Sequence, residues 1–145
     1  MITGMSHATV WVLDQDRALA FYTEKLGFEV GADADIGDGA RWLAVRAPKQ
    51  PDVHVVLASP GPPMLSEEDG KVIRDLVAKG AMGAGVLRTD DVRATYDELR
   101  AKGVEFIQEP AERPYGIEAL FRDDSGNWFS LTQPKGWGEP PPGRG

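Results

Sequence analysis

The sequence predicts an α+β fold built from two βαβββ modules. The same order of strand and helix signals occurs in both halves of the 145-residue chain, and short residue pairs return at matching places in that order. Arg17-Ala18 returns as Arg93-Ala94, and Gly27 returns as Gly103. Prolines at 60–63 separate the halves. We expect one domain over residues 1–134, with modules at about 5–60 and 81–134 and a linker at about 61–80.

The first module begins with a β-rich run that leads into a capped helix. Asp14 or Asp16 can cap this helix, and Gly27 can end it, because glycine readily adopts the left-handed conformation of a helix C-terminus. Residues 37–39, Gly-Asp-Gly, have the chemistry of a tight turn. The expected elements are a strand over 6–13, a helix carrying Leu19, Tyr22 and Leu26, a strand beginning at 28–30, and strands over 41–46 and 53–58.

The second module repeats this order. Asp90-Asp91 supplies the cap, Gly103 ends the helix, and residues 124–127 form the last hairpin turn. The expected elements are strands over 84–88, 104–108, 117–122 and 128–132, and a helix with Val92, Tyr96 and Leu99 on one face.

The segments outside the modules differ in composition. Ser66 precedes Asp69 by three residues, which resembles a capping box and predicts a short helix in the linker. Residues 135–145 contain too little apolar content to pack, so we expect a flexible tail there.

Composition excludes several classes of function. The 16 basic and 23 acidic residues give a net charge of -7, the wrong sign for a surface that binds nucleic acid by neutralising phosphates. No run approaches the roughly 18 to 20 apolar residues of a membrane helix, and residues 1–5 lack the pattern of a signal peptide. We therefore expect a soluble, cytoplasmic protein. Because the chain has no cysteine, any bound metal would need His, Asp or Glu ligands.

Two motifs resemble those of a known superfamily. They are Phe21-Tyr22-Thr23-Glu24-Lys25-Leu26-Gly27-Phe28 and Phe121-Arg122-Asp123-Asp124-Ser125-Gly126-Asn127. Within two βαβββ modules they resemble the vicinal oxygen chelate superfamily, which includes glyoxalase I, extradiol dioxygenases, and fosfomycin and bleomycin resistance proteins. The resemblance covers nearly all of residues 7–134. It implies that the modules form a U-shaped mixed sheet, the glyoxalase/bleomycin-resistance fold, whose concave face holds a ligand, and that the protein is a homodimer.

The resemblance also implies a set of metal-ligand positions, most of which have lost their ligand here. In metal-using relatives the first strand of each module supplies a histidine and the last strand an acid, which suits Zn, Ni, Fe or Mn. The matching residues are His7 and Val56 in the first module, and Ala84 (Gly83 if the alignment slips by one) and Ser130 in the second. Only His7 can bind a metal, so we expect no metal cofactor at the usual site.

His54 leaves an alternative open. It lies two residues before Val56, so both side chains face the same side of the strand, near His7. His7 and His54 could hold a divalent metal with Glu118 or water as further ligands, although two histidines from one module make a poor cage. The simpler interpretation is that both histidines line a pocket and hydrogen-bond a ligand or water.

The same count by twos predicts an aromatic, mildly polar cleft. Alternate residues of the first and last strands face inward when counted from His7 and from Ser130. Aromatic rings stack on flat ligands, and an indole N–H can donate a hydrogen bond. The predicted ligand-binding set is His7, Thr9, Trp11, Trp42, His54, Val56, Tyr115, Trp128 and Ser130, and Thr132 shares this face.

The remaining polar residues do not identify a catalytic group. Ser130 is a poor candidate nucleophile, because no histidine lies in its module and nothing resembles a nucleophile elbow. Its hydroxyl is more simply a hydrogen-bonding group for a ligand or a neighbour. Glu118 and Arg122 share a strand face, where one of them could act as a general base or an anion clamp, or both could keep the sheet soluble.

We therefore expect metal-independent binding of a hydrophobic or aromatic small molecule, with sequestration of a drug or natural product, as in antibiotic resistance, as one such role. The alternative is an enzyme of the same superfamily, a lyase, isomerase or dioxygenase, with an atypical metal centre at His7 and His54 or with metal-free chemistry. A third hypothesis is a regulatory or scaffolding relative whose cleft is partly filled.

Overall fold

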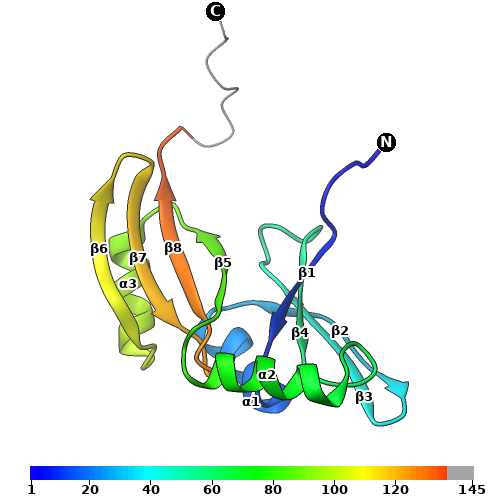
Figure 1. Ribbon diagram of the computed structural model, residues 1–145. Helices are drawn as coiled ribbons and strands as arrows, with labels where there is room; N and C mark the ends of the chain where they lie inside the picture. Colours follow the sequence, from blue (N-terminus) through cyan, green and yellow to red (C-terminus); the bar gives the residue numbers. More distant parts are fainter. Residues whose placement is uncertain (137–145) are drawn as a thin grey trace, which may run out of the picture. The chain divides into compact units, whose positions relative to one another are not determined.

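Residues 1–136 are described by a computed structural model of the chain (Figure 1). The expected tail over 135–145 lies outside the described residues from position 137 on. The elements are β1 (His7–Trp11), α1 (Gln15–Ala20), the π-helical turn η1 (Phe21–Lys25), β2 (Glu29–Gly37), β3 (Ala40–Arg46), β4 (His54–Ala58), α2 (Glu67–Ala78), β5 (Gly83–Arg88), α3 (Val92–Ala101), β6 (Phe106–Arg113), β7 (Gly116–Arg122) and β8 (Trp128–Pro134).

Two four-stranded sheets carry the fold. The strand order is β1-β4-β3-β2 in the first sheet and β5-β8-β7-β6 in the second. β1 runs parallel to β4, whereas β3 runs antiparallel to both of its neighbours, so the first sheet is mixed. The predicted α+β class and the repeated βαβββ order are thus confirmed. The U-shaped arrangement of the modules stays a prediction.

The chain divides into two compact units. The first contains Met1–Ala84 together with Arg122–Trp128, and the second contains Gly85–Phe121 together with the residues from Phe129 on. The hairpin turn between β7 and β8 therefore packs with the first unit. In the described part of the chain, no helix is long and apolar enough to cross a membrane.

Local signals set the ends of the helices as the sequence predicts. Asp14, Ser66 and Asp91 are the N-caps of α1, α2 and α3, and each side chain accepts a hydrogen bond from the backbone N–H three residues further on. After the first and third helices the chain turns at Gly27, with φ 76°, and at Gly103, with φ 87°.

Two strands depart most from the sequence prediction, whereas the ends of the others agree with it to within two residues. β6 covers 106–113 rather than 104–108, because the N–H of Val104 still bonds the carbonyl of Leu99 and so belongs to the end of α3. Pro110 lies within β6, where the register against β7 shifts, since a proline offers no N–H to the ladder. β2 extends to Gly37, although its small, polar sequence lacks a strand signal, because it pairs along β3.

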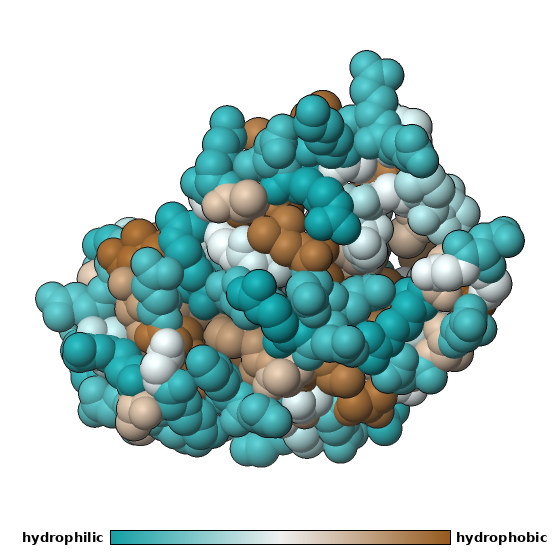
Figure 2. Space-filling model, turned by 90° about the horizontal axis from the view of Figure 1, so that it is seen from below, coloured by the Kyte–Doolittle hydropathy of each residue, from teal (hydrophilic) through white to brown (hydrophobic). Residues whose placement is uncertain are grey.

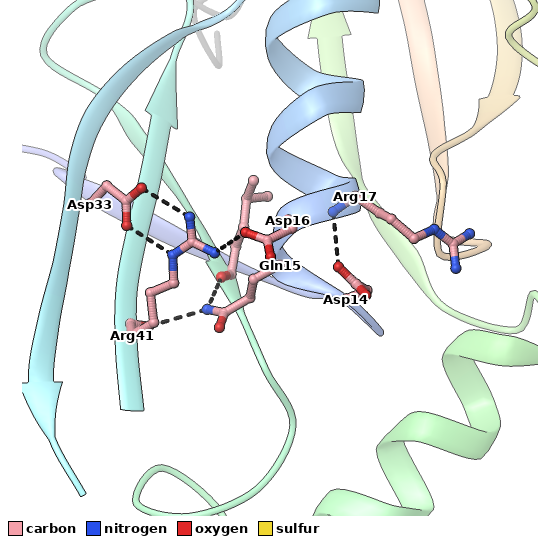
Figure 3. Close-up of polar contacts among 7 residues, drawn as sticks. Asp14, Gln15, Asp16, Arg17, Asp33 and Arg41 are labelled. Atoms are coloured by element: carbon pink, nitrogen blue, oxygen red, sulfur yellow. Dashed lines mark hydrogen bonds and ion pairs between the residues drawn. The ribbon is translucent and has the colours of Figure 1, made fainter. Parts of the chain in front are cut away.

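Arg41 joins β3 to both β2 and α1 (Figure 3). Its guanidinium donates to both carboxylate oxygens of Asp33, at 2.8 and 2.9 Å, and to Asp16 at 2.7 Å. These bonds raise the pKa of Arg41 and lower that of Asp33. Beside them, Nε2 of Gln15 donates to the carbonyl oxygens of Arg41 and Leu57. The start of α1 is thereby fixed against the first sheet.

The cores of the two units differ in character. The second is aromatic: Phe121 stacks on Phe129 with ring centroids 5.4 Å apart, and Phe106 meets Tyr96 edge to face at 4.6 Å. The first is mostly aliphatic, and its fully buried side chains include Val12, Tyr22, Leu43, Val45, Leu57 and Val77.

On the face shown in Figure 2, apolar residues form small groups separated by hydrophilic ones.

Asp123 is the hydrogen-bonding centre of the turn between β7 and β8. Its Oδ1 accepts the backbone N–H groups of Ser125, Gly126 and Asn127 at 2.9 to 3.0 Å. Its Oδ2 accepts the Tyr22 hydroxyl at 2.7 Å and the Asn127 side-chain amide at 3.0 Å. Burial and the nearby Asp123 charge raise the pKa of Tyr22. One buried carboxylate thus folds the turn and binds it to the helix that follows β1.

The same turn also bonds to the end of β1. The amide nitrogen of Asn127 donates to the carbonyl of Trp11 at 2.7 Å. The hydroxyl of Ser125 accepts the backbone N–H of Leu13 at 2.9 Å. Residues more than a hundred positions apart are therefore held together, which explains why the turn packs with the first unit.

Asp124 contrasts with its neighbour Asp123. Both oxygens of its carboxylate are enclosed and have no hydrogen-bond partner among the described residues. Burial, followed by the charge of Asp123, raises the pKa of Asp124 to about 6. The ionised form of this side chain therefore opposes folding above that pH.

Replacing Asp123 with alanine should destabilise the protein severely. Asp123→Ala would leave the buried Tyr22 hydroxyl and the turn N–H groups without their acceptor, for an expected loss of about 3 to 5 kcal/mol in the free energy of unfolding. Urea unfolding followed by circular dichroism measures this loss. Asp97→Ala, at an exposed site on α3, is the control and should change stability by less than about 0.5 kcal/mol. Similar values for both variants would contradict the role assigned to Asp123.

Replacing Asp124 with asparagine should stabilise the protein in a pH-dependent way. Because the folded pKa of Asp124 lies above its ordinary value of 3.8, the folded state binds more protons between about pH 4 and pH 6, and stability falls as pH rises through this window. With allowance for solvent screening, Asp124→Asn should be more stable than wild type by on the order of 1 to 2 kcal/mol at pH 7.5. The gain should shrink toward zero near pH 4. Urea unfolding at several pH values tests this, and a pH-independent difference would contradict it.

Candidate functional site

Strand β1 presents one polar and aromatic face and one buried face. His7 and Thr9 are exposed and Trp11 is half-buried, whereas Val10 and Val12 are 4% and 0% exposed. The predicted alternation is therefore seen over residues 9–12, whereas Ala8, which was expected to face the helix, is exposed. His7, Thr9 and Trp11 share the other face of the strand, on which Trp11 packs against a second buried cluster.

The two histidines of the chain lie side by side. β1 and β4 pair in parallel with His7 opposite His54, and the imidazole rings stack with centroids 5.0 Å apart. The ring of Trp42, from β3, lies 6.0 Å from that of His7. The Nδ1 atom of His7 is 2.9 Å from the hydroxyl of Ser6. The sheet thus brings His7 and His54 together, as the sequence led us to expect, and places Trp42 beside His7.

Small apolar residues form the floor beside these rings. Ala44, Val56 and Ala58 are buried together, and Trp11 and Trp42 pack against them. Sequence reasoning missed both alanines, although counting by twos from Trp42 and from Val56 reaches them. We call this group of residues the His–Trp face: His7, Trp11, Trp42, His54 and Ala32, together with the buried Ala44, Val56 and Ala58.

The second module carries a matching arrangement at β5 and β8. The N–H of His54 bonds the carbonyl of Ser6 at 2.8 Å, and the N–H of Trp128 bonds the carbonyl of Met82 at 3.1 Å. Trp128 therefore takes the place of His54, and Gly83, not Ala84, takes the place of His7. The alignment of the two modules is offset by one residue within β5.

Gly83 is required by the indole of Trp128. A Cβ atom added to this glycine would lie 2.7 Å from Cζ2 of Trp128 and 2.9 Å from Cε2, which is too close for any real contact. A side chain that could bind a metal would displace the ring. In the second module, the space that a side chain at position 83 would occupy is therefore taken by the indole of Trp128, from the neighbouring strand β8. Trp128 is 37% exposed.

In the second unit, Ser130 belongs to a chain of hydroxyl groups around Glu118. The Ser130 hydroxyl lies 2.6 Å from Oε2 of Glu118 and 2.7 Å from the Thr132 hydroxyl. The Tyr115 hydroxyl donates to Oε1 of Glu118 at 2.8 Å, and this bond raises the pKa of Tyr115. Ser130 and Thr132 are buried, and their hydroxyl groups are hydrogen-bonded within the protein. The structure places Tyr115, Glu118 and Ser130 together. This grouping was not predicted from the sequence.

Arg122 has a structural role that the sequence did not reveal. Its Nη1 donates to the carbonyl oxygens of Gly80 and Gly126 at 3.2 and 2.9 Å. A Cβ atom on Gly80 would fall 2.6 Å from this nitrogen. The guanidinium therefore secures the end of the linker helix to the turn, and its possible role as an anion clamp stays a prediction.

The metal positions implied by the superfamily do not fit a divalent cation here. Val56 is 3% exposed and apolar, Gly83 lies under an indole, and the Ser130 hydroxyl is bonded to Glu118. His7 alone keeps a metal-binding side chain. Over residues 1–136, no group of three or more His, Cys, Asp or Glu side chains is arranged to hold a metal ion.

Comparisons with known proteins agree with this fold. Residues 4–131 match the family model of the glyoxalase/bleomycin resistance protein/dioxygenase superfamily. The crystal structure of UcmS2 is similar at 56% identity and a TM-score of 0.86, over 92% of this chain and 99% of that one. TnmS3, an antibiotic binding protein from Streptomyces sp. CB03234, is 36% identical with a TM-score of 0.73, over 92% and 98% of the two chains. YetH of Bacillus subtilis is 34% identical over 133 residues, 92% of this chain and all of its own. The chain therefore belongs to the glyoxalase/bleomycin resistance protein/dioxygenase superfamily.

Proposed function

We propose that this protein binds a hydrophobic or aromatic small molecule without a metal, and that it sequesters a drug or natural product. The observation that carries the proposal is the His–Trp face, where indole rings border a floor of alanine and valine. Such a surface offers broad apolar contact together with a few polar groups, as small-molecule sites do. The similarity to TnmS3, an antibiotic binding protein, supports a ligand of this class.

The remaining predicted ligand contacts are assigned to this function as part of the proposal. Thr9 is exposed beside the His–Trp face and can add a hydroxyl contact. Trp128 offers a partly exposed indole, and Tyr115 is exposed with its hydroxyl held by Glu118. Ser130, in the second unit, is buried, and its hydroxyl is bonded to Glu118. The homodimer expected for this superfamily is likewise a proposal, which light scattering tests.

The rival function is that of a lyase, isomerase or dioxygenase with a metal at His7 and His54. The stacked imidazoles favour it, since two neighbouring histidines are a frequent start to a metal site. Against it, the Glu118 carboxylate already accepts hydrogen bonds from Tyr115 and Ser130, in the second unit. We therefore rank binding ahead of catalysis.

Tryptophan fluorescence gives a direct test of binding. In a Trp137→Phe parent, which removes emission from outside the described residues, a panel of polyaromatic antibiotics should include a compound that quenches emission saturably. Trp42→Ala should weaken its binding about tenfold or more, because the ring contributes both area and stacking. Ile107→Ala, at an exposed apolar residue on β6, is the matched control and should leave the Kd unchanged. No quenching across a broad panel, or equal Kd values in all variants, would contradict the proposal.

A further inference from the structure

Gly31 makes room for the ring of His54. In the pairing of β2 with β3, Val30 lies opposite Val45 and Ala32 opposite Ala44, so Gly31 is the extra residue of a β-bulge. A Cβ atom added to Gly31 would lie 2.6 Å from Cε1 of His54 and would overlap Nδ1. A glycine inside a strand often marks such a close approach. The bulge therefore sets the position of the imidazole.

The two ring nitrogens of His54 have different surroundings. Nδ1 is fully enclosed and has no hydrogen-bond partner among the described residues, whereas Nε2 is not enclosed in this way. If Nδ1 carried the proton, the structure would bury an unpaired N–H donor. Buried donors without a partner are rarer than buried acceptors, and an unpaired polar group is costly. Of the two neutral tautomers, the environment thus favours the one with its proton on Nε2.

We propose that His54 is the polar specificity determinant of the His–Trp face, and that it donates its Nε2–H to an acceptor atom of the ligand. The preferred ligand is then a planar aromatic molecule with a carbonyl or comparable acceptor at its edge. Gly31 is a positioning residue, because it allows the ring to seat with Nδ1 against the strand. The ligand part of this inference rests on the proposed binding function, whereas the tautomer does not.

Nitrogen NMR tests the tautomer without any ligand. In uniformly 15N-labelled protein at pH 9, where free imidazole is neutral, long-range 1H–15N correlations of His54 should show a protonated Nε2 and an unprotonated Nδ1. His54→Leu identifies the signals by their loss. A protonated Nδ1, or a comparable mixture of the two tautomers, would overturn the inference.

A matched pair of probes tests the donor. 2-Acetylnaphthalene and 2-isopropenylnaphthalene have nearly the same shape, but only the first has an acceptor oxygen. Wild type should bind the first about five- to tenfold more tightly, as one hydrogen bond allows. His54→Leu and Gly31→Ala should abolish this preference. Equal binding of both probes by wild type, or a preference kept by both variants, would overturn the donor role.

Gly83→Ala is the matched control, because it displaces Trp128 instead of His54. This variant should bind both probes more weakly and keep the ratio of their two Kd values. Loss of the preference for 2-acetylnaphthalene in this variant would overturn the assignment to His54. Thermal unfolding of each variant confirms that it is folded. Should neither probe bind wild type, the proposed function fails for this ligand class, and the NMR result still decides the tautomer.

Discussion

The packing of the first unit depends on the hydrogen bonds that the buried carboxylate of Asp123 accepts. A charge removed from water is stable only when its oxygens are fully hydrogen-bonded, and here backbone N–H groups, an amide and the Tyr22 hydroxyl supply those bonds. Because the donors come from both the turn and the helix after β1, the carboxylate joins segments that lie far apart in the chain. Asp124, one residue later, lacks such partners, and burial raises its pKa accordingly. Adjacent residues of the same type therefore have opposite effects on stability.

The scaffold of the superfamily is retained, and His7 keeps its histidine, whereas the other three metal-ligand positions carry side chains that do not bind metal. At each of these three positions the structure shows a local role for the replacement: Val56 joins an apolar floor, Gly83 accommodates an indole, and Ser130 is bonded to Glu118. These are replacements by groups that pack or pair locally, so restoring a single ligand would not rebuild a cation site. The same features provide aromatic and apolar contact area, which is what a binding protein for flat molecules needs.

Local signals allowed much of the fold to be predicted from the sequence. The caps at Asp14, Ser66 and Asp91 depend on bonds within one helical turn, and alternation along β1 follows from strand geometry. Long-range effects could not be predicted. The bond between Tyr22 and Asp123, the role of Gly31 beneath His54, and the one-residue offset that places Gly83 opposite Trp128 all require the tertiary structure. The length of β2 was missed because its partner strand, rather than its own composition, determines it.

The dependence of ligand binding on metal distinguishes a metal-free binding protein from a metal-dependent one. The Kd of the antibiotic that quenches tryptophan emission most strongly should be measured on EDTA-stripped protein and on protein reloaded with Zn²⁺, Ni²⁺, Mn²⁺ or Fe²⁺, with metal content determined by elemental analysis. If the protein binds its ligand without a metal, the Kd is the same in every sample. Metal-independent binding would be contradicted by two results together. One is stoichiometric metal in the wild type that is lost in His7→Ala and His54→Ala, and the other is ligand binding that disappears when the metal is removed and returns when it is restored.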